Sequence, residues 1–187
     1  MIRFGTLGAA AITPRALVAP CVDEPRAFVY AIAARDRKRA ESFAAYAGIR
    51  HVLDDYRQVV EHPKVTAVYN PLPIHLHHEW TIKALQAGKH VLCEKSFSSN
   101  AMEAQDMARV AAETGLVLME AFHYRYHPLF VRAKEIVDSG ALGSVREIRA
   151  VFTVPAAAPD NIRMNYHTGG GVTMDIGCYP ISWARHI

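Results

Sequence analysis

The sequence contains few cysteines and no long apolar run. Its three cysteines, Cys21, Cys93 and Cys178, are widely separated, so they form neither a disulfide framework nor a paired set of zinc ligands. We therefore expect a reducing compartment, the cytoplasm. No stretch approaches the length of a membrane span, and Met1 to Gly8 resembles a strand and a turn rather than a secretion signal. The composition thus excludes disulfide-stapled and membrane classes, and we expect no membrane partner.

An excess of charge of one sign is also missing. The chain has 21 Lys and Arg against 18 Asp and Glu, which gives a formal charge of +3 spread along the sequence. Without a basic block, there is no electrostatic reason to expect nucleic acid as a partner. With 187 residues, 51% of them hydrophobic, the chain is long and apolar enough to bury a core.

The first 120 residues alternate between short apolar runs and amphipathic helical segments. The pattern predicts strands over 2–7, 27–34, 65–69, 90–93 and 116–119, with helices that include 9–22, 36–47 and 100–114. Gly48 and Gly115 follow two of these helices, where a helix stop is expected. Between 69 and 90, Leu76, Trp80 and Ala84 share one face of a further helix. This alternation is typical of an α/β domain with a parallel, doubly wound sheet over residues 1–120.

Residues 121–187 have a different pattern. Leu129, Ala133 and Ile136 mark one helix face, and Val145 to Val154 alternates between apolar and polar residues. Such alternation predicts a strand with one wet face, usually in an antiparallel sheet. The region therefore resembles the start of an α+β domain. One strand cannot form a stable sheet alone, so we expect this second domain to be incomplete.

A degenerate dinucleotide fingerprint follows the first predicted strand. Gly8 allows a tight turn, and Ala10 is small enough for backbone N–H groups to approach a pyrophosphate. Ala9 and Ile12 belong to the same loop, which leads into a helix N-terminus. A plain packing turn is the alternative, but the position at the first strand-to-helix turn favours a cofactor.

Arginines follow the second predicted strand, where an NAD-selective site usually has a carboxylate. Arg35 and Arg39 are one helical turn apart and offer planar donors to a 2'-phosphate, so NADP is expected, with NAD as the alternative. Asp36 is the counter-argument, because it could itself bind the ribose. An exposed, charged helix start is the third interpretation.

A histidine cluster invites a metal interpretation. His75, His77, His78 and Glu79 lie close together, but the spacing of a zinc-protease motif is absent. A solvated or cofactor-facing helix start explains the cluster better, and we expect no metal.

Four motifs in order resemble one known family. They are VYNPLPIH at 68–75, AGKHVLCEK at 87–95, EAFHYRYHP at 120–128 and GGGVTMDIGCY at 169–179. Together they resemble the glucose-fructose oxidoreductase, inositol dehydrogenase and rhizopine-catabolism protein family, and within it the dimeric dihydrodiol dehydrogenase and NADP-dependent xylose dehydrogenase branch. The resemblance implies an N-terminal Rossmann domain that binds NAD or NADP, and a longer chain that forms homo-oligomers through its C-terminal sheet.

The family's catalytic residues fall on Lys95, Asp175 and Tyr179. The resemblance implies that Tyr179 carries a proton and that Lys95 is its activating cation, with Asp175 orienting the substrate hydroxyl or the lysine. An ordinary tyrosine, with a pKa near 10, is a poor proton carrier at neutral pH unless a cation favours its anion. Asp175 and Tyr179 are four positions apart, so on a helix they share a face.

The resemblance also implies further cofactor positions. The predicted set is Asn70, Pro71, Leu72, His75, Glu94, Lys95 and Arg125, with Tyr124 in the same segment. Arg163 matches a basic residue before the glycine run. Ser96 departs from the family, which nearly always has a proline there.

The sequence therefore predicts an NADP-dependent oxidoreductase. It would transfer a hydride between nicotinamide and a carbinol or carbonyl of a sugar, polyol or trans-dihydrodiol. The alternative is a dinucleotide-binding protein without catalysis, but a sensor has no chemical need for Lys95, Asp175 and Tyr179 together. The missing sheet predicts either a fragment of a longer enzyme or completion by another chain, and we favour the fragment.

Overall fold

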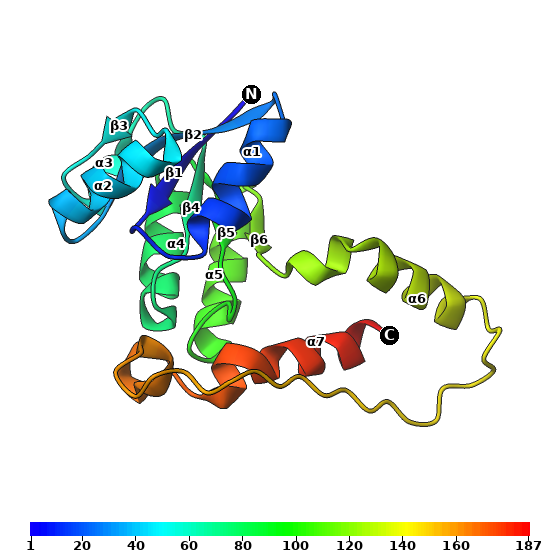
Figure 1. Cartoon of the computed structure of the whole chain (residues 1–187). Coiled ribbons are helices and arrows are strands. Elements are labelled where there is room, and N and C mark those ends of the chain that lie inside the picture. Colours follow the sequence, from blue (N-terminus) through cyan, green and yellow to red (C-terminus); the bar gives the residue numbers. More distant parts are fainter. The chain divides into compact units, whose positions relative to one another are not determined.

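The computed structural model describes residues 1–187, which divide into two compact units, Met1–Glu120 and Ala121–Ile187. Each unit is described by itself. The first contains a six-stranded sheet with helices on both faces, and the second consists of helices and turns (Figure 1).

The first unit is a parallel α/β domain, as predicted. Its strands are β1 (Ile2–Leu7), β2 (Ala27–Ala33), β3 (His51–Val52), β4 (Ala67–Asn70), β5 (His90–Cys93) and β6 (Leu118–Glu120), in the spatial order β3-β2-β1-β4-β5-β6. All five pairings are parallel. The strand order reverses between β1 and β4, and in such sheets the carboxyl ends beside this point form the ligand crevice.

The helices of this unit are α1 (Ala19–Asp23), α2 (Arg37–Ala47), α3 (Tyr56–Glu61), α4 (His77–Gln86) and α5 (Ala101–Thr114). A wide helical turn, Pro14–Val18, precedes α1. Gly48 and Gly115 end α2 and α5 in the left-handed conformation, which confirms the predicted stops.

Two hydrophobic cores form, one on each face of the sheet, because successive strand residues point to opposite sides. Ala31 and Ala33 of β2 join a core with residues of α3, α4 and α5, such as Val59, Leu85 and Met107. The second core lies beneath α2 and contains Ile32, Ala34, Ala40, Ala44 and Ile49. The apolar runs of the sequence are therefore strands buried on both faces.

Two elements escaped the sequence prediction, β3 and α3. Both are short, so neither gives a clear periodic pattern. A local signal existed at the start of α3, where the Asp55 side chain accepts a hydrogen bond from Gln58 N at 2.8 Å and Gln58 Oε1 accepts one from Asp54 N at 3.0 Å. This arrangement is similar to a capping box, except that Gln58 accepts from Asp54 N, one residue before the N-cap Asp55.

The second unit contains α6 (Pro128–Asp138) and α7 (Cys178–His186), with short turns at His123–Tyr126, Ile162–Met164 and Tyr166–Thr168. The strand predicted over Val145–Val154 is not confirmed, because these residues form no strand. A strand needs a partner for its hydrogen-bonded ladder, and residues 121–187 contain no other strand. The predicted antiparallel sheet is therefore absent from this unit.

Candidate cofactor and catalytic site

The glycine turn after β1 has the geometry that a dinucleotide loop requires. Gly8 has a φ of 84°, and its N–H donates to Ala33 O at 2.6 Å, which joins the ends of β1 and β2. A Cβ at this position would lie 3.2 Å from Leu72 Cδ2, so a side chain would be both strained and crowded. Ala9 is buried, while Ile12 is 44% exposed. The loop thus keeps its backbone close to the β4 end while its tip faces outward.

Arg39 lies directly on this loop. Its Nη2 donates to Ala9 O at 2.9 Å, although Arg39 belongs to α2. Asp36 caps α2, because its carboxylate accepts from Arg39 N at 3.0 Å. The structure therefore gives Asp36 a helix-capping role, and it brings the Arg39 guanidinium to the glycine loop.

Arg35 and Arg39 both lie near the hydroxyl of Tyr56. Burial raises the pKa of Tyr56, while the charges of Arg35 and Arg39 and a hydrogen bond from Arg35 N oppose the rise. The same hydroxyl lies 3.8 Å from the Cβ position of Gly8. Tyr56 was missed by the sequence reasoning, because it lies on the short helix α3. It links the glycine turn to both predicted arginines.

The arginines of this segment differ in their partners. Arg37 forms ion pairs with Glu41, at 2.9 Å, and with Asp54. Arg35 and Arg39 form no ion pair with a carboxylate, so their charges remain available to an anionic ligand. A buried hydroxyl, Thr13 Oγ1, has no hydrogen-bond partner. The residues present thus fit an NADP molecule on this loop.

The carboxyl end of β4 is tied to that of β5. Glu94 N donates to Asn70 O at 3.0 Å, and the buried hydroxyl of Tyr69 donates to Glu94 Oε1 at 2.6 Å. Burial is the main cause that raises the pKa of Tyr69, and the Glu94 charge adds to it. Lys95 follows directly, and its N–H donates to Glu94 Oε2 at 3.3 Å. Glu94 therefore belongs to a fixed framework from which Lys95 extends.

Asn70 is fully buried rather than open to a ligand. Its Nδ2 donates to His77 O at 3.2 Å and to Thr81 Oγ1 at 3.3 Å, and its Oδ1 accepts from Leu72 N at 3.4 Å. The Asn70 side chain thus shapes the loop that contains Pro71 and Leu72.

The three histidines of the predicted cluster have separate environments. His75 is exposed on the turn Ile74–Leu76, whereas His77 is buried and His78 Nε2 lies 2.7 Å from Asp106 Oδ2. No group of three His, Cys, Asp or Glu side chains is arranged to hold a metal ion. Sequence reasoning chose His75, but His77 is the histidine that contacts both loops at this end of the sheet.

The glycine run of the second unit supports an ion pair. Gly170 packs against the 162–165 turn so closely that a Cβ would lie 2.6–2.7 Å from three carbonyl oxygens. Gly171 N donates to Arg163 O at 2.8 Å, and Arg163 Nε contacts Asp175 Oδ1 at 3.1 Å. The glycines therefore allow the backbone approach that holds Arg163 against Asp175, which assigns a contact to the basic residue before the run.

Tyr179 lies in an aromatic cluster of the second unit. Asp175 belongs to a wide helical turn, Thr173–Gly177, and Tyr179 to the first turn of α7, so they do not share one regular helix. The Tyr179 ring centroid lies 5.2 Å from that of Phe152 and 5.3 Å from that of Phe122. Arg125 is exposed on the turn His123–Tyr126.

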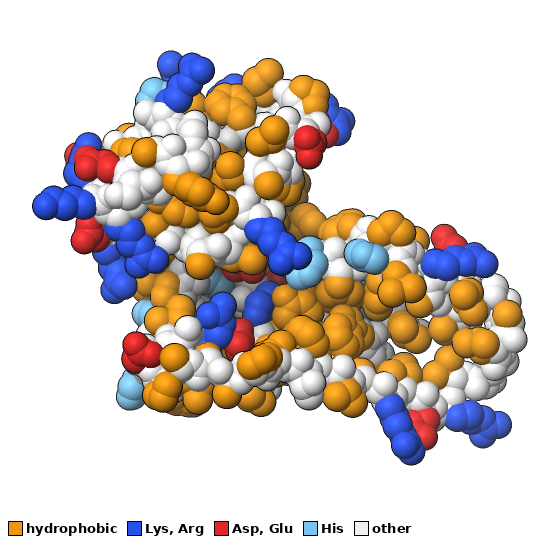
Figure 2. Space-filling view, viewed as in Figure 1, with side chains coloured by type: hydrophobic (Ala, Val, Ile, Leu, Met, Phe, Trp, Pro, Cys, Tyr) orange, Lys and Arg blue, Asp and Glu red, His pale blue; other side chains and the backbone are white.

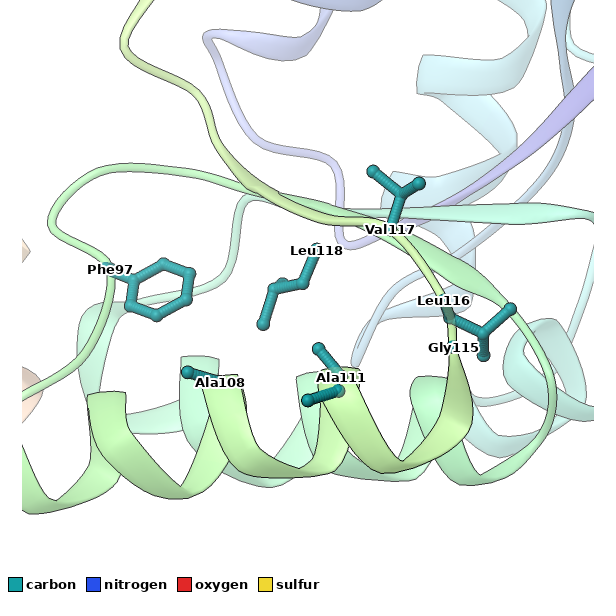
Figure 3. A pocket seen from close by; sticks show the side chains of 8 residues that line it. Phe97, Ala108, Ala111, Gly115, Leu116, Val117 and Leu118 are labelled. Atoms are coloured by element: carbon teal, nitrogen blue, oxygen red, sulfur yellow. The ribbon is translucent and has the colours of Figure 1, made fainter.

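A cavity of about 500 Å³ lies at the sheet edge formed by β6. Phe97, Ala108, Ala111 and Leu118 are among its lining side chains (Figure 3). No charged residue lines it, so it does not fit the phosphates of a dinucleotide. None of the helices combines the length and apolarity needed to cross a bilayer.

Comparison with known proteins agrees with this geometry. Residues 2–122 match a family model described as "Oxidoreductase family, NAD-binding Rossmann fold". The chain belongs to this oxidoreductase family. Residues 130–187 match the model of the GFO/IDH/MocA C-terminal domain, so both units fall within it. The predicted family and its α/β fold are confirmed.

Curated members of the family resemble the chain over nearly all of its length. It is 41% identical to dTDP-3,4-didehydro-2,6-dideoxy-alpha-D-glucose 3-reductase of Actinomadura kijaniata, over 96% of this chain and 54% of that protein. It is 40% identical to D-xylose 1-dehydrogenase (NADP(+)) 2 of Haloferax volcanii, over 98% of this chain and 56% of that protein. The chain spans about half the length of these relatives.

A solved structure of the family extends the likeness to three dimensions. KijD10, a 3-ketoreductase from Actinomadura kijaniata solved with NADP and TDP-benzene, matches with a TM-score of 0.91 and 40% identity. The match covers 98% of this chain and 56% of KijD10.

Proposed function

We propose that this protein is an NADP-dependent oxidoreductase that acts on a sugar-related substrate. It transfers a hydride between the nicotinamide and a carbon that alternates between carbinol and carbonyl. Sugars are favoured over other polyols and dihydrodiols, because the similar reductase and xylose dehydrogenase have sugar substrates in their names.

One observation carries the choice of NADP over NAD. Arg35 and Arg39 lack carboxylate partners and lie near Tyr56 beside the glycine turn, while Arg37 between them is paired with Glu41 and Asp54. Two unpaired guanidinium groups favour a ligand with an additional phosphate. The names of the similar xylose dehydrogenase and of the KijD10 complex, which include NADP, support the same cofactor.

The residues of the two units would divide the chemistry between them. NADP supplies or accepts the hydride when it is bound, with Gly8, Ala9, Ala10 and Ile12 around its pyrophosphate. Reduction of a carbonyl leaves an oxygen that needs a proton, and the Tyr179 hydroxyl donates it. The Lys95 ammonium stabilises the charge left on that tyrosine, and Asp175 orients the substrate hydroxyl or the lysine.

The remaining predicted positions serve the cofactor in this proposal. Pro71, Leu72 and Glu94 lie at the carboxyl ends of β4 and β5, where the nicotinamide half would pass. Asn70 acts through the shape of that loop, and His75 and Arg125 offer exposed polar side chains.

Cofactor titration tests the proposal. NADPH and NADH binding are compared by fluorescence in the parent protein and in Arg35→Ala, Arg39→Ala and the matched control Arg37→Ala. We expect tighter NADPH binding by the parent protein, a preference that falls in each of Arg35→Ala and Arg39→Ala, is mostly lost when both are replaced, and is kept in Arg37→Ala. The loss of two charge-assisted phosphate contacts corresponds to about 1 to 3 kcal/mol. Equal affinities of the parent protein for the two cofactors would contradict the proposal.

A further inference from the structure

A buried histidine joins the two loops at the nicotinamide end of the sheet. His77, the first residue of α4, is 1% exposed. Its Nε2 lies 2.7 Å from Leu72 O, in the loop after β4, and its Nδ1 lies 2.8 Å from Ser96 O, in the loop after β5. One ring thus spans two chain segments that follow neighbouring strands.

The chemistry of the ring makes these contacts unequal. A carbonyl oxygen only accepts, and a neutral imidazole has one N–H while an imidazolium has two. Burial lowers the pKa of His77, and the carbonyl groups of Ser96, Leu72 and Phe97 oppose this shift. In its neutral form, therefore, the ring donates to only one of the two carbonyl groups.

The segment that receives the Nδ1 contact contains Lys95. The Lys95–Ser96 peptide bond is cis, and Ser96 is buried. After Ser96 in the chain, Phe97 N donates to Glu120 Oε1 at 3.0 Å. Before Lys95, Glu94 N donates to Asn70 O at 3.0 Å. Between these two bonds, the Ser96 carbonyl is the group through which His77 acts on the segment.

The start of α4, which contains His77, is itself fixed by a side chain of β4. The Asn70 side chain donates to His77 O at 3.2 Å and to Thr81 Oγ1, one helical turn further along α4. Because Asn70 is the last residue of β4, the start of α4 is fixed to the sheet rather than to a mobile loop.

We propose that His77 is a positioning residue that fixes Lys95 by donating a hydrogen bond from Nδ1 to the Ser96 carbonyl. The inference rests on the proposed role of Lys95 in the oxidoreductase. It adds a residue outside the motif set, one that touches neither cofactor nor substrate and acts through the Lys95 backbone.

A pair of conservative variants isolates this hydrogen bond. The amide of Asn at position 77 reaches the place of Nδ1, and the longer amide of Gln reaches the place of Nε2. His77→Asn therefore keeps a donor toward Ser96, and His77→Gln keeps one toward Leu72. His75→Asn, at the exposed histidine two residues earlier, is the matched control for the exchange measurement.

The first measurement needs neither cofactor nor turnover. Hydrogen exchange is followed at the Glu94 and Phe97 amides, with the Leu53 amide, which bonds to Ile32 O, as the internal reference. We expect His77→Gln to speed exchange at Glu94 and Phe97 about tenfold or more, while Leu53 is unchanged. His77→Asn and His75→Asn should keep parental rates. In the parent protein, ¹⁵N spectra of the ring should show a proton on Nδ1.

The second measurement tests whether the hydrogen bond from His77 to Ser96 O affects the function of Lys95. We expect His77→Gln to lower kcat about tenfold or more, with the NADPH Kd within about threefold of the parent value. His77→Asn should retain most of the parental kcat. If the parent protein binds no NADPH, that result counts against the proposed function alone. The exchange rates and the ring spectra would still report on the hydrogen bond between His77 and Ser96 O.

Three results would overturn the inference. They are an unprotonated Nδ1, equal exchange at Glu94 and Phe97 in His77→Gln and His77→Asn, and a kcat that is the same in both variants. Since both substitutions are polar and similar in size, a general loss of folding would affect them alike and would appear at Leu53.

Discussion

The buried hydroxyl of Tyr69 donates a 2.6 Å hydrogen bond to Oε1 of Glu94, the residue before Lys95. Tyr69 is 0% exposed and lies on β4, so the bond crosses from one strand to the end of its neighbour. A hydrogen bond to a carboxylate is stronger than one between neutral groups, and its acceptor is costly to leave unpaired.

Removal of this hydroxyl should weaken the fold. We expect Tyr69→Phe to lower the free energy of unfolding by about 1 to 3 kcal/mol, because Glu94 loses a donor in a partly buried site. Urea denaturation measures the change, with Tyr46→Phe as the control, since Tyr46 is 79% exposed. Equal stability of the two variants would show that Glu94 finds another donor.

A side chain at Gly170 should disturb the turn that carries Arg163. In Gly170→Ala the new Cβ would meet Ile162 O, Arg163 O and Asn165 O at 2.6–2.7 Å. We expect a destabilisation of about 1 to 3 kcal/mol and faster hydrogen exchange at Gly171, whose N–H bonds to Arg163 O.

Gly177→Ala is the control for this substitution, because a Cβ there has no contact shorter than 3.4 Å. Parental exchange at Gly171 in both variants would mean that the turn does not depend on the absence of a side chain.

Loss of the proposed proton carrier, Tyr179, should slow turnover without weakening cofactor binding. We expect Tyr179→Phe to lower kcat by about two to four orders of magnitude, and Lys95→Met to do the same, with NADPH affinity nearly unchanged. Asp175→Asn should fall between these variants and the parent, because it keeps the shape and removes the charge.

A double variant that combines Lys95→Met with Tyr179→Phe tests whether the two residues act together. Its loss of kcat should be smaller than the product of the two single losses, since both act on one proton transfer. Near-normal turnover of Tyr179→Phe would move the proton source elsewhere, with Lys95 as the first candidate and His123 as the second.

Two histidines should make stability depend on pH. The pKa of His77 is lowered mainly by burial, and that of His62 by partial burial and by the charges of His51, Lys64 and Lys89. Below the ordinary value of about 6.5, the unfolded chain therefore binds more protons than the folded one. Their contribution to stability is complete above that value and is lost as the pH falls through the lower, folded-state pKa.

Urea denaturation at pH values between 5 and 8 measures this dependence. His77→Gln and His62→Gln should each flatten the decline on the acid side relative to the parent protein. An acid decline that is as steep in both variants as in the parent would assign it to other groups.

The second unit should promote association. None of its residues after Phe122 is classed as buried, and large apolar side chains such as Leu129, Val172 and Ile181 are 73%, 75% and 55% exposed. Figure 2 shows hydrophobic side chains gathered over α6 and α7. Such surface favours self-association. We expect the sedimentation coefficient of the 187-residue chain to rise with concentration, and a constant monomer value would contradict a homo-oligomer formed through this unit.

The parallel α/β domain could be predicted from local sequence pattern. Short apolar runs predict strands buried on both faces, and Gly48 and Gly115 mark helix ends through local backbone preferences. The strands at 2–7 and 90–93 were predicted with the bounds that the structure has, because their apolar runs end abruptly at Gly8 and Glu94. Motif order also determined the family. The strand at 145–154 was not confirmed, because its ladder depends on a partner that local pattern does not supply.

The contacts of the candidate site residues could not be predicted from the sequence and became known only from the tertiary structure. The sequence pointed to Arg35 and Arg39 without showing their partners, and the fold pairs Arg37 between them with Glu41 and Asp54 while it leaves Arg35 and Arg39 without carboxylate partners. The family motif points to His75, but that residue is exposed on the turn before α4, whereas His77, the first residue of α4, is buried between two carbonyl groups. These differences arise from contacts between segments far apart in the chain, which residue type and spacing do not encode locally.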